Sequence, residues 1–255
     1  ILSLPLISAA CGPVITILLL TLCWWAMYES AKNVLVLCHQ QGSGVDFTSI
    51  ISAKLTPLAH LIFLSFYFLL LYSLLSAYLV QGGDLTRLML NRTSSGNDLF
   101  FNKCVFIAVF GLLIFSISFT DKINKVFLGI KLLLFFSLCA FLAYSGEINK
   151  FFGLPLSLYA LVYALPTLII SFGFHNIIPT LYEYQQGDFT KTKRAVFYGG
   201  LFVLLVYIVW VLVCFFAVSV ADFHHIFLLG NRTEDFVKVL AGVVENERVK
   251  DGVFL

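Results

Sequence analysis

The chain alternates long runs of apolar residues with short polar segments. A helix needs roughly 20 apolar residues to cross the hydrocarbon core of a membrane. Runs of about that length predict spanning helices over residues 14–37, 58–80, 102–120, 123–144, 156–182 and 195–221. A half-span over residues 1–10 precedes them, because Cys11-Gly12-Pro13 interrupts the first run. We therefore predict one partial transmembrane domain over residues 1–255.

The polar segments predict the connections between these spans. A short helix is expected around Phe47–Leu55, and the 58–80 span is expected to end at Gln81-Gly82-Gly83-Asp84. Asp121-Lys122 predicts a tight turn between the third and fourth spans. Residues 222–252 predict an outer loop that contains an amphipathic helix from Glu234 to Glu245.

The composition agrees with a lipid environment and excludes several classes of protein. Of the 255 residues, 60% are hydrophobic and 12% are charged, whereas soluble domains carry about 25% charged residues. The net charge of +2 is not concentrated in one block, so nucleic acid is not expected as a partner. The six cysteines form no CxxC pair, and no metal site or cofactor is predicted. No hydrolase or phosphate-binding motif occurs, so we do not expect an enzyme.

Basic residues in the short connections predict the orientation. They occur in the segments 38–57, 121–125 and 183–194, which alternation of the spans places on one side of the membrane. The positive-inside rule makes that side cytoplasmic. Segment 81–103, on the opposite side, also carries basic residues, so the bias is moderate.

The most informative polar feature inside a span is the sequence Ser171-Phe172-Gly173-Phe174-His175. Gly173 and the nearby Pro179 both weaken a helix, so we predict a break near 171–175 with free backbone carbonyls and amides. Broken helices at membrane depth hold charged substrates in secondary transporters. His175 adds an imidazole that can exchange a proton near neutral pH. The alternative is a proline-kinked helix in which His175 bonds to a neighbouring backbone.

The same residues carry a resemblance to a known family. Ser171-Phe172-Gly173-Phe174-His175 with Ile178-Pro179 resembles the sixth-helix signature of the hydroxy/aromatic amino-acid permeases, which include tyrosine- and tryptophan-specific proton symporters. Ile1-Leu2-Ser3-Leu4-Pro5-Leu6 resembles the end of that family's first helix, and the segment from Tyr72 to Gly83 resembles its third. The resemblance implies an all-α polytopic membrane protein with part of the five-plus-five inverted-repeat amino-acid transporter fold.

The resemblance also implies a function and a set of site residues. It implies a symporter of the bacterial cytoplasmic (inner) membrane whose partners are an aromatic amino acid, most of all tyrosine, and a proton. Ser171, Gly173 and His175 would line the substrate site from the sixth helix, and Tyr72 and Ser76, four residues apart on one helix face, would meet the substrate from the third. Packing between helices is the alternative for that pair. Phe172 and Phe174 would stack on the substrate ring, or else contact lipid.

Lys131 is a second candidate for proton coupling, beside His175. It follows Lys125 by six residues and lies about 9 Å deeper in an apolar helix. In the resembled fold, the fifth helix borders a cation site of sodium-coupled relatives, so we hypothesise that Lys131 replaces that cation. The alternative is that its side chain extends to the cytoplasmic interface.

Other functions remain open on the sequence alone. A serine or threonine permease of the same superfamily would need a smaller pocket with fewer aromatic residues. A channel or a non-transporting membrane protein is a third possibility, although no span shows a continuous polar stripe. The glycine-rich segment that should precede Ile1 in the resembled family is not in this sequence, so we expect residues 1–255 alone not to transport.

Overall fold

The computed structural model describes residues 3–42, 44, 47–52, 55–89, 103–104, 107–108, 117–144, 158–228 and 233–250. All of the regular elements in these ranges are helices. The chain divides into two compact units, which we describe separately. The first comprises Ile1–Ile50 with Phe136–Leu255, and the second comprises Ile51–Phe135.

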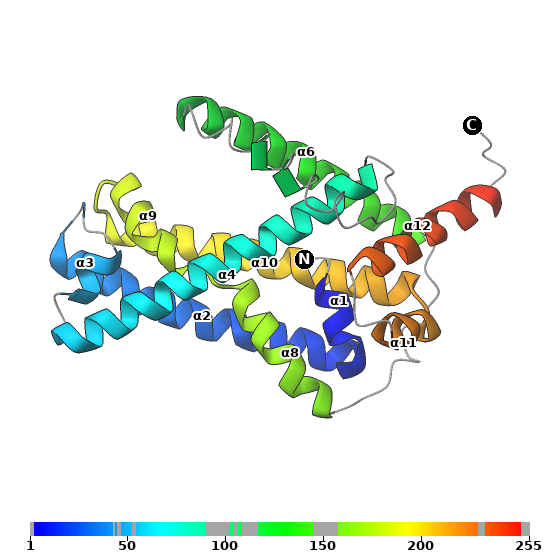
Figure 1. Cartoon of the computed structure of the whole chain (residues 1–255), viewed down its shortest axis with the longest axis horizontal. Helices are drawn as coiled ribbons and strands as arrows, with labels where there is room; N and C mark the ends of the chain where they lie inside the picture. Colours follow the sequence, from blue (N-terminus) through cyan, green and yellow to red (C-terminus); the bar gives the residue numbers. More distant parts are fainter. Residues whose placement is uncertain are drawn as a thin grey trace. The chain divides into compact units, whose positions relative to one another are not determined.

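The helices follow the apolar runs of the sequence (Figure 1). The first unit contains α1 (Ser3–Ser8), the 3-10 turn η1 (Ala9–Cys11), α2 (Pro13–Gln41), α3 (Phe47–Ser52), α8 (Leu158–Ser171), the 3-10 turn η2 (His175–Ile177), α9 (Ile178–Tyr184), α10 (Phe189–Ala217), α11 (Val220–Leu228) and α12 (Thr233–Lys250). The second contains α4 (Pro57–Met89) and the first part of α6 (Ile117–Tyr144).

Five stretches in the described ranges are long and apolar enough to cross a membrane. They are Pro13–Gln41, Pro57–Val80, Lys125–Tyr144, Ala164–Tyr184 and Phe189–Ala217. Their apolar side chains point outward as well as inward: Leu58 and Phe66 of α4 are 70% and 68% exposed. Such surfaces are stable in lipid and not in water. The chain is therefore a multi-pass α-helical membrane protein. The predicted 102–120 span lies largely outside the described residues.

The most extensive packing in the first unit joins α2 to α10, which run alongside each other (Figure 1). Gly200 of α10 is buried, and a Cβ atom at this position would lie 2.9 Å from Nε1 of Trp24 in α2. The indole also contacts the ring of Phe197, at 5.6 Å between centroids. Glycine at position 200 therefore allows the two helices to approach until the indole covers the α10 backbone.

A second contact region joins α2, α3, α9 and α10. Ala31, Leu35 and Cys38 of α2 are buried against Ile178 and Tyr182 of α9, together with Ile50 of α3 and Val196 of α10. The hydroxyl of Tyr182 lies 2.9 Å from Nδ1 of His39. Because residues from four helices meet here, α9 is held against both α2 and α10.

The first apolar run is interrupted at Gly12. Gly12 has a φ of 74°, in the left-handed region that glycine tolerates, and Pro13 begins α2. The buried hydroxyl of Thr16 donates to the carbonyl of Gly12 at 2.7 Å, and that of buried Ser8 donates to the carbonyl of Leu4. The polar groups at this break are therefore satisfied by nearby residues of the same segment.

The turn between α9 and α10 is built by residues 185–188. Gln186 and Gly187 have φ values of 55° and 77°, and the Gly187 amide donates to the carbonyl of Tyr182 at 3.0 Å. The Asp188 carboxylate then caps α10 by accepting from the amide of Lys191 at 2.9 Å. This hydrogen bond holds the pKa of Asp188 below its usual range, so the cap stays charged at neutral pH.

The apolar stretch Pro57–Val80 matches the predicted 58–80 span, but the prediction that its helix ends at Gln81-Gly82-Gly83-Asp84 is wrong, because α4 continues to Met89. Gly82 and Gly83 are buried, and a Cβ atom on Gly83 would lie 2.7 Å from Cγ of Lys103. Gly83 therefore allows a close approach to Lys103, and neither glycine stops the helix. Their helix cost of about 1 kcal/mol each is too small to end a long helix.

The predicted tight turn at Asp121-Lys122 is also wrong, because α6 runs without interruption from Ile117 to Tyr144. Neither residue breaks a helix as proline or glycine does, so two adjacent charges alone did not justify a turn. The bounds of the predicted 195–221 span also differ from those of the helix. Its helix begins at Phe189, where Asp188 caps it, and ends at Ala217.

We predict that Gly200→Ala destabilises the packing of α2 on α10. The added Cβ would overlap the Trp24 indole, and overpacking of this kind costs roughly 1–3 kcal/mol. Gly199→Ala is the matched control, because a Cβ there meets nothing within 4 Å. Thermal unfolding of the purified variants in detergent measures the difference. Equal melting temperatures for the two variants would contradict this account of Gly200.

Candidate functional site

The segment between α8 and α9 leaves the α-helical path. α8 ends at Ser171, residues 172–174 have no regular structure, and η2 leads into α9 at Ile178. Gly173 is suited to this bend, because a Cβ there would lie 3.0 Å from the carbonyl oxygen of Ile170. Pro179 lies in the first turn of α9, where its missing N–H costs nothing.

Several backbone groups in this segment have hydrogen-bond partners. The amides of Phe172 and Gly173 donate to the carbonyls of Ile169 and Ile170, at 3.1 and 3.0 Å. The Ser171 carbonyl accepts the hydroxyl of Tyr207 in α10, at 3.0 Å. The expectation of free backbone groups near 171–175 is therefore wrong for these atoms. Turn bonds and a neighbouring tyrosine replace the lost helical bonds, as burial away from water requires.

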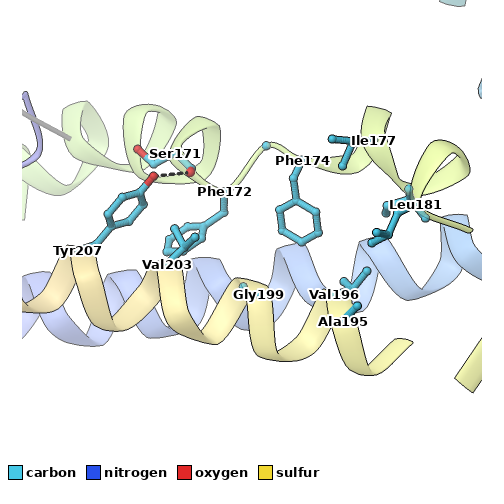
Figure 2. Close-up of a pocket in the computed structure, with 13 residues that line it drawn as sticks. Ser171, Phe172, Phe174, Ile177, Leu181, Ala195, Val196, Gly199, Val203 and Tyr207 are labelled. Carbon is cyan, nitrogen blue, oxygen red and sulfur yellow. Dashed lines mark hydrogen bonds between the residues drawn. The ribbon is translucent and has the colours of Figure 1, made fainter. Parts of the chain in front are cut away.

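A cavity of about 330 Å³ lies between this segment and α10, and we call it the break cavity (Figure 2). Its wall is mostly apolar and contains no ionisable group apart from the hydroxyl of Tyr207. The lining residues are Ser171, Phe172, Gly173, Phe174, Ile177, Ile178, Leu181, Ala195, Val196, Gly199, Gly200, Val203 and Tyr207. Such a wall suits binding of a molecule with a large apolar part, and it offers no acid–base pair for catalysis.

Two aromatic contacts shape the wall. The rings of Phe172 and Tyr207 lie 5.3 Å apart in a tilted arrangement, and Phe172 is only 2% exposed. Phe174 projects from the unwound segment toward α10 (Figure 2). Its ring stacks on the imidazole of His175, with centroids 5.5 Å apart and planes 16° apart. The side chain of Tyr207 therefore both contacts Phe172 and fixes the carbonyl end of α8.

The structure brings together four of the predicted site residues. Ser171, Phe172, Gly173 and Phe174 all line the break cavity. His175 does not line it. Nε2 of His175 is buried without a partner in the described part of the chain.

The remaining predicted residues lie in the second unit. Tyr72 and Ser76 are on α4, and the side chain of Tyr72 is 72% exposed. Lys131 is on α6 and is exposed. None of the three is among the residues that line the break cavity.

Sequence reasoning missed the contribution of α10. Ala195, Gly199, Val203 and Tyr207 line the cavity at intervals of four residues, which places them on one helix face. Small residues at 195 and 199 followed by a single hydroxyl at 207 form a pattern that is visible in the sequence. It was obscured by the uniformly apolar character of this span.

The chain was compared with known proteins. The tryptophan/tyrosine permease family matches residues 1–254. Tyrosine-specific transport system 1 of Haemophilus influenzae is 25% identical over 210 residues, which are 82% of this chain and 52% of that protein. Tryptophan-specific transport protein of the same organism is 27% identical over 212 residues, 76% of this chain and 50% of that protein.

A tyrosine permease of Enterobacter agglomerans is 31% identical over 147 residues, which cover 54% of this chain and 35% of the relative. This chain thus spans about half the length of the first two relatives. No solved structure matches it significantly. Because the family match extends over nearly every residue and the helices are those of a multi-pass membrane protein, the chain belongs to the tryptophan/tyrosine permease family.

Proposed function

We propose that the protein, at its full natural length, is a proton symporter of the bacterial inner membrane that imports aromatic amino acids, with tyrosine preferred. The observation that carries the proposal is the break cavity with its aromatic wall of Phe172, Phe174 and Tyr207. Its volume of about 330 Å³ falls at the lower end of the roughly 300–1,000 Å³ of small-molecule pockets. The relatives named for tyrosine and tryptophan transport support the same substrate class.

The wall of the cavity supports an aromatic substrate over a small hydroxylated one. The substrate ring would lie against Phe174 and Tyr207 in tilted or offset contact, with Gly199 leaving space for it. Its charged ends would meet backbone groups of the segment between α8 and α9 other than the Phe172 and Gly173 amides and the Ser171 carbonyl, which already have partners. Broken helices play this part in secondary transporters. Serine or threonine would leave most of this apolar wall without contact, which makes a permease for those substrates the weaker candidate.

The arrangement of the broken segments supports a five-plus-five inverted-repeat fold for the full-length protein. Two interrupted apolar segments, the one broken at Gly12 and the one broken after Ser171, belong to the first unit. α1 packs directly against α8, so these segments are neighbours. Neighbouring interrupted helices are the structural mark of substrate sites in repeat transporters.

Two residues are candidates for proton coupling. His175 stacks on Phe174, so a proton on the imidazole can influence a ring of the cavity wall directly. Lys131 lies in the apolar helix α6 and has no carboxylate partner within the described ranges. In this proposal, one of the two exchanges a proton in each transport cycle.

Uptake measurements with the full-length protein in proteoliposomes test the substrate class. We expect labelled tyrosine to accumulate when a proton gradient is applied, and unlabelled tryptophan and phenylalanine to compete better than serine. Gly199→Leu should raise the KM for tyrosine roughly tenfold or more, because the new side chain occupies the break cavity.

Gly129→Leu is the matched control for this experiment. Gly129 is also a helical glycine whose Cβ would meet nothing within 4 Å, but it lies on α6 and not on the cavity wall. If both variants transport like wild type, the break cavity is not the substrate site. If serine competes best, the permease for small hydroxylated amino acids is the better assignment.

Tyr207→Phe should remove the hydrogen bond that holds the end of α8 against α10, while keeping an aromatic ring in the wall of the break cavity. The Ser171 carbonyl loses the hydroxyl that it accepts at 3.0 Å, and an acceptor left without a partner costs about 1–3 kcal/mol. We expect a lower melting temperature together with an altered KM for tyrosine. Tyr198→Phe on the same helix is the control, since its side chain is 65% exposed. Identical behaviour of the two variants would refute a role for the Tyr207 hydroxyl.

Proton coupling is tested by comparing accumulation with exchange. If Lys131 carries the proton, Lys131→Gln should abolish uptake against a gradient but preserve counterflow of tyrosine, which needs no net proton movement. Lys125→Gln, nearer the start of the same apolar stretch, should keep both activities. If His175 carries the proton, His175→Gln should instead abolish uptake against a gradient and preserve counterflow. Undiminished accumulation in both variants would exclude both residues.

A further inference from the structure

A second cavity opens beside the N-terminal end of α10, on a different face from the break cavity. It has a volume of about 240 Å³, and we call it the basic cavity. Its walls are Tyr28 of α2 and, from α10, Thr190, Lys193, Arg194, Phe197 and Tyr198. The α10 residues at 190, 193, 194 and 197 follow helical spacing, so they form one continuous stripe along the helix.

The charges around this cavity are not balanced. Other cations near it have carboxylate partners on their own helices, since Lys191 lies 3.2 Å from Asp188 and Lys32 lies 2.6 Å from Glu29. Lys193 and Arg194, by contrast, have no such partner among the residues that the structure describes. The basic cavity therefore presents two uncompensated positive charges beside aromatic rings. An anion is the chemical complement of such a site.

The length of α10 places the basic cavity at the edge of the bilayer. Its 29 residues span about 43 Å, which exceeds the roughly 30 Å hydrocarbon core. All its charges fall within the first six residues, and the uncharged stretch from 195 to 217 is itself long enough to cross. Lys193 and Arg194 thus lie at the level of the lipid headgroups, on the side that the positive-inside rule makes cytoplasmic.

An apolar track continues from the mouth of the cavity along the outside of α10. Tyr198, Phe202, Leu205 and Val209 are 65%, 47%, 53% and 37% exposed, and their spacing puts them on one face. A free phosphate ion has no apolar part that could contact this track. A molecule with an anionic head and a long apolar tail would contact both the cations and the apolar track.

We propose that the basic cavity binds the phosphate headgroup of an anionic phospholipid whose acyl chain lies along Tyr198, Phe202, Leu205 and Val209. The guanidinium of Arg194 and the ammonium of Lys193 pair with the phosphate, and Thr190 offers a hydroxyl donor. The rings of Tyr28 and Phe197, with centroids 5.3 Å apart, form the wall toward α2. A lipid bound here would contact both helices of the main packing pair, α2 and α10.

Lipid retention by the full-length protein tests this site. The purified protein in detergent is titrated with phosphatidylglycerol, and bound lipid is counted by native mass spectrometry, with phosphatidylcholine as the neutral reference. We expect phosphatidylglycerol to bind in preference to phosphatidylcholine. The double variant Lys193→Gln with Arg194→Gln should bind phosphatidylglycerol about 10- to 30-fold more weakly, on the basis of the usual contribution of two basic residues at a membrane surface.

Two further variants keep the outcome interpretable. Lys191→Gln removes a charge from the same turn but outside the cavity, so it should leave lipid binding nearly unchanged. Exchanging Lys193 and Arg194 for each other keeps both charges and should preserve binding. An equal loss for Lys191→Gln, or no loss for the double variant, would overturn the proposal. Displacement of the lipid by millimolar inorganic phosphate would also overturn it, and would identify a free-phosphate site instead.

Discussion

The hydrogen bond from Tyr207 to the carbonyl of Ser171 is the contact on which the described site depends. A helix that ends at membrane depth exposes carbonyl groups that lipid cannot satisfy, and each unsatisfied group costs several kcal/mol. α8 ends at such a depth, and its last carbonyl is satisfied from another helix. The chain can then leave the helical path for residues 172–174, and this departure creates the break cavity.

The same helix organises the rest of the first unit. α10 packs on α2 through Gly200, which lies against Trp24. It also supplies one wall of the break cavity, which includes Gly199, and most of the residues that line the basic cavity. Adjacent glycines thus have different tasks, because successive residues point about 100° apart around a helix. Position 200 allows close packing, and position 199 leaves open space.

The sequence predicted the membrane environment and most helices, since both follow from long apolar runs. It also predicted a break near Gly173, where a weak helix former and a proline occur close together. It did not predict the continuation of α4 through Gly82-Gly83, because whether glycine ends a helix or permits close packing depends on the neighbour, here Lys103. It did not predict the hydrogen bond of Tyr207, because the spacing of residues on α10 does not show which group 36 residues away accepts the hydroxyl.

The link between Ser171 and Tyr207 has a consequence for biogenesis. Membrane helices are synthesised in order, so α8 is complete before the residues of α10 that contain Tyr207 have emerged. Until then, the terminal carbonyl of α8 has only water or the insertion machinery as a partner, which favours keeping this end out of the hydrocarbon. The site thus reaches its final form only when α10 docks. Variants that delay the insertion of α10 would expose an unfinished α8 to quality-control proteases.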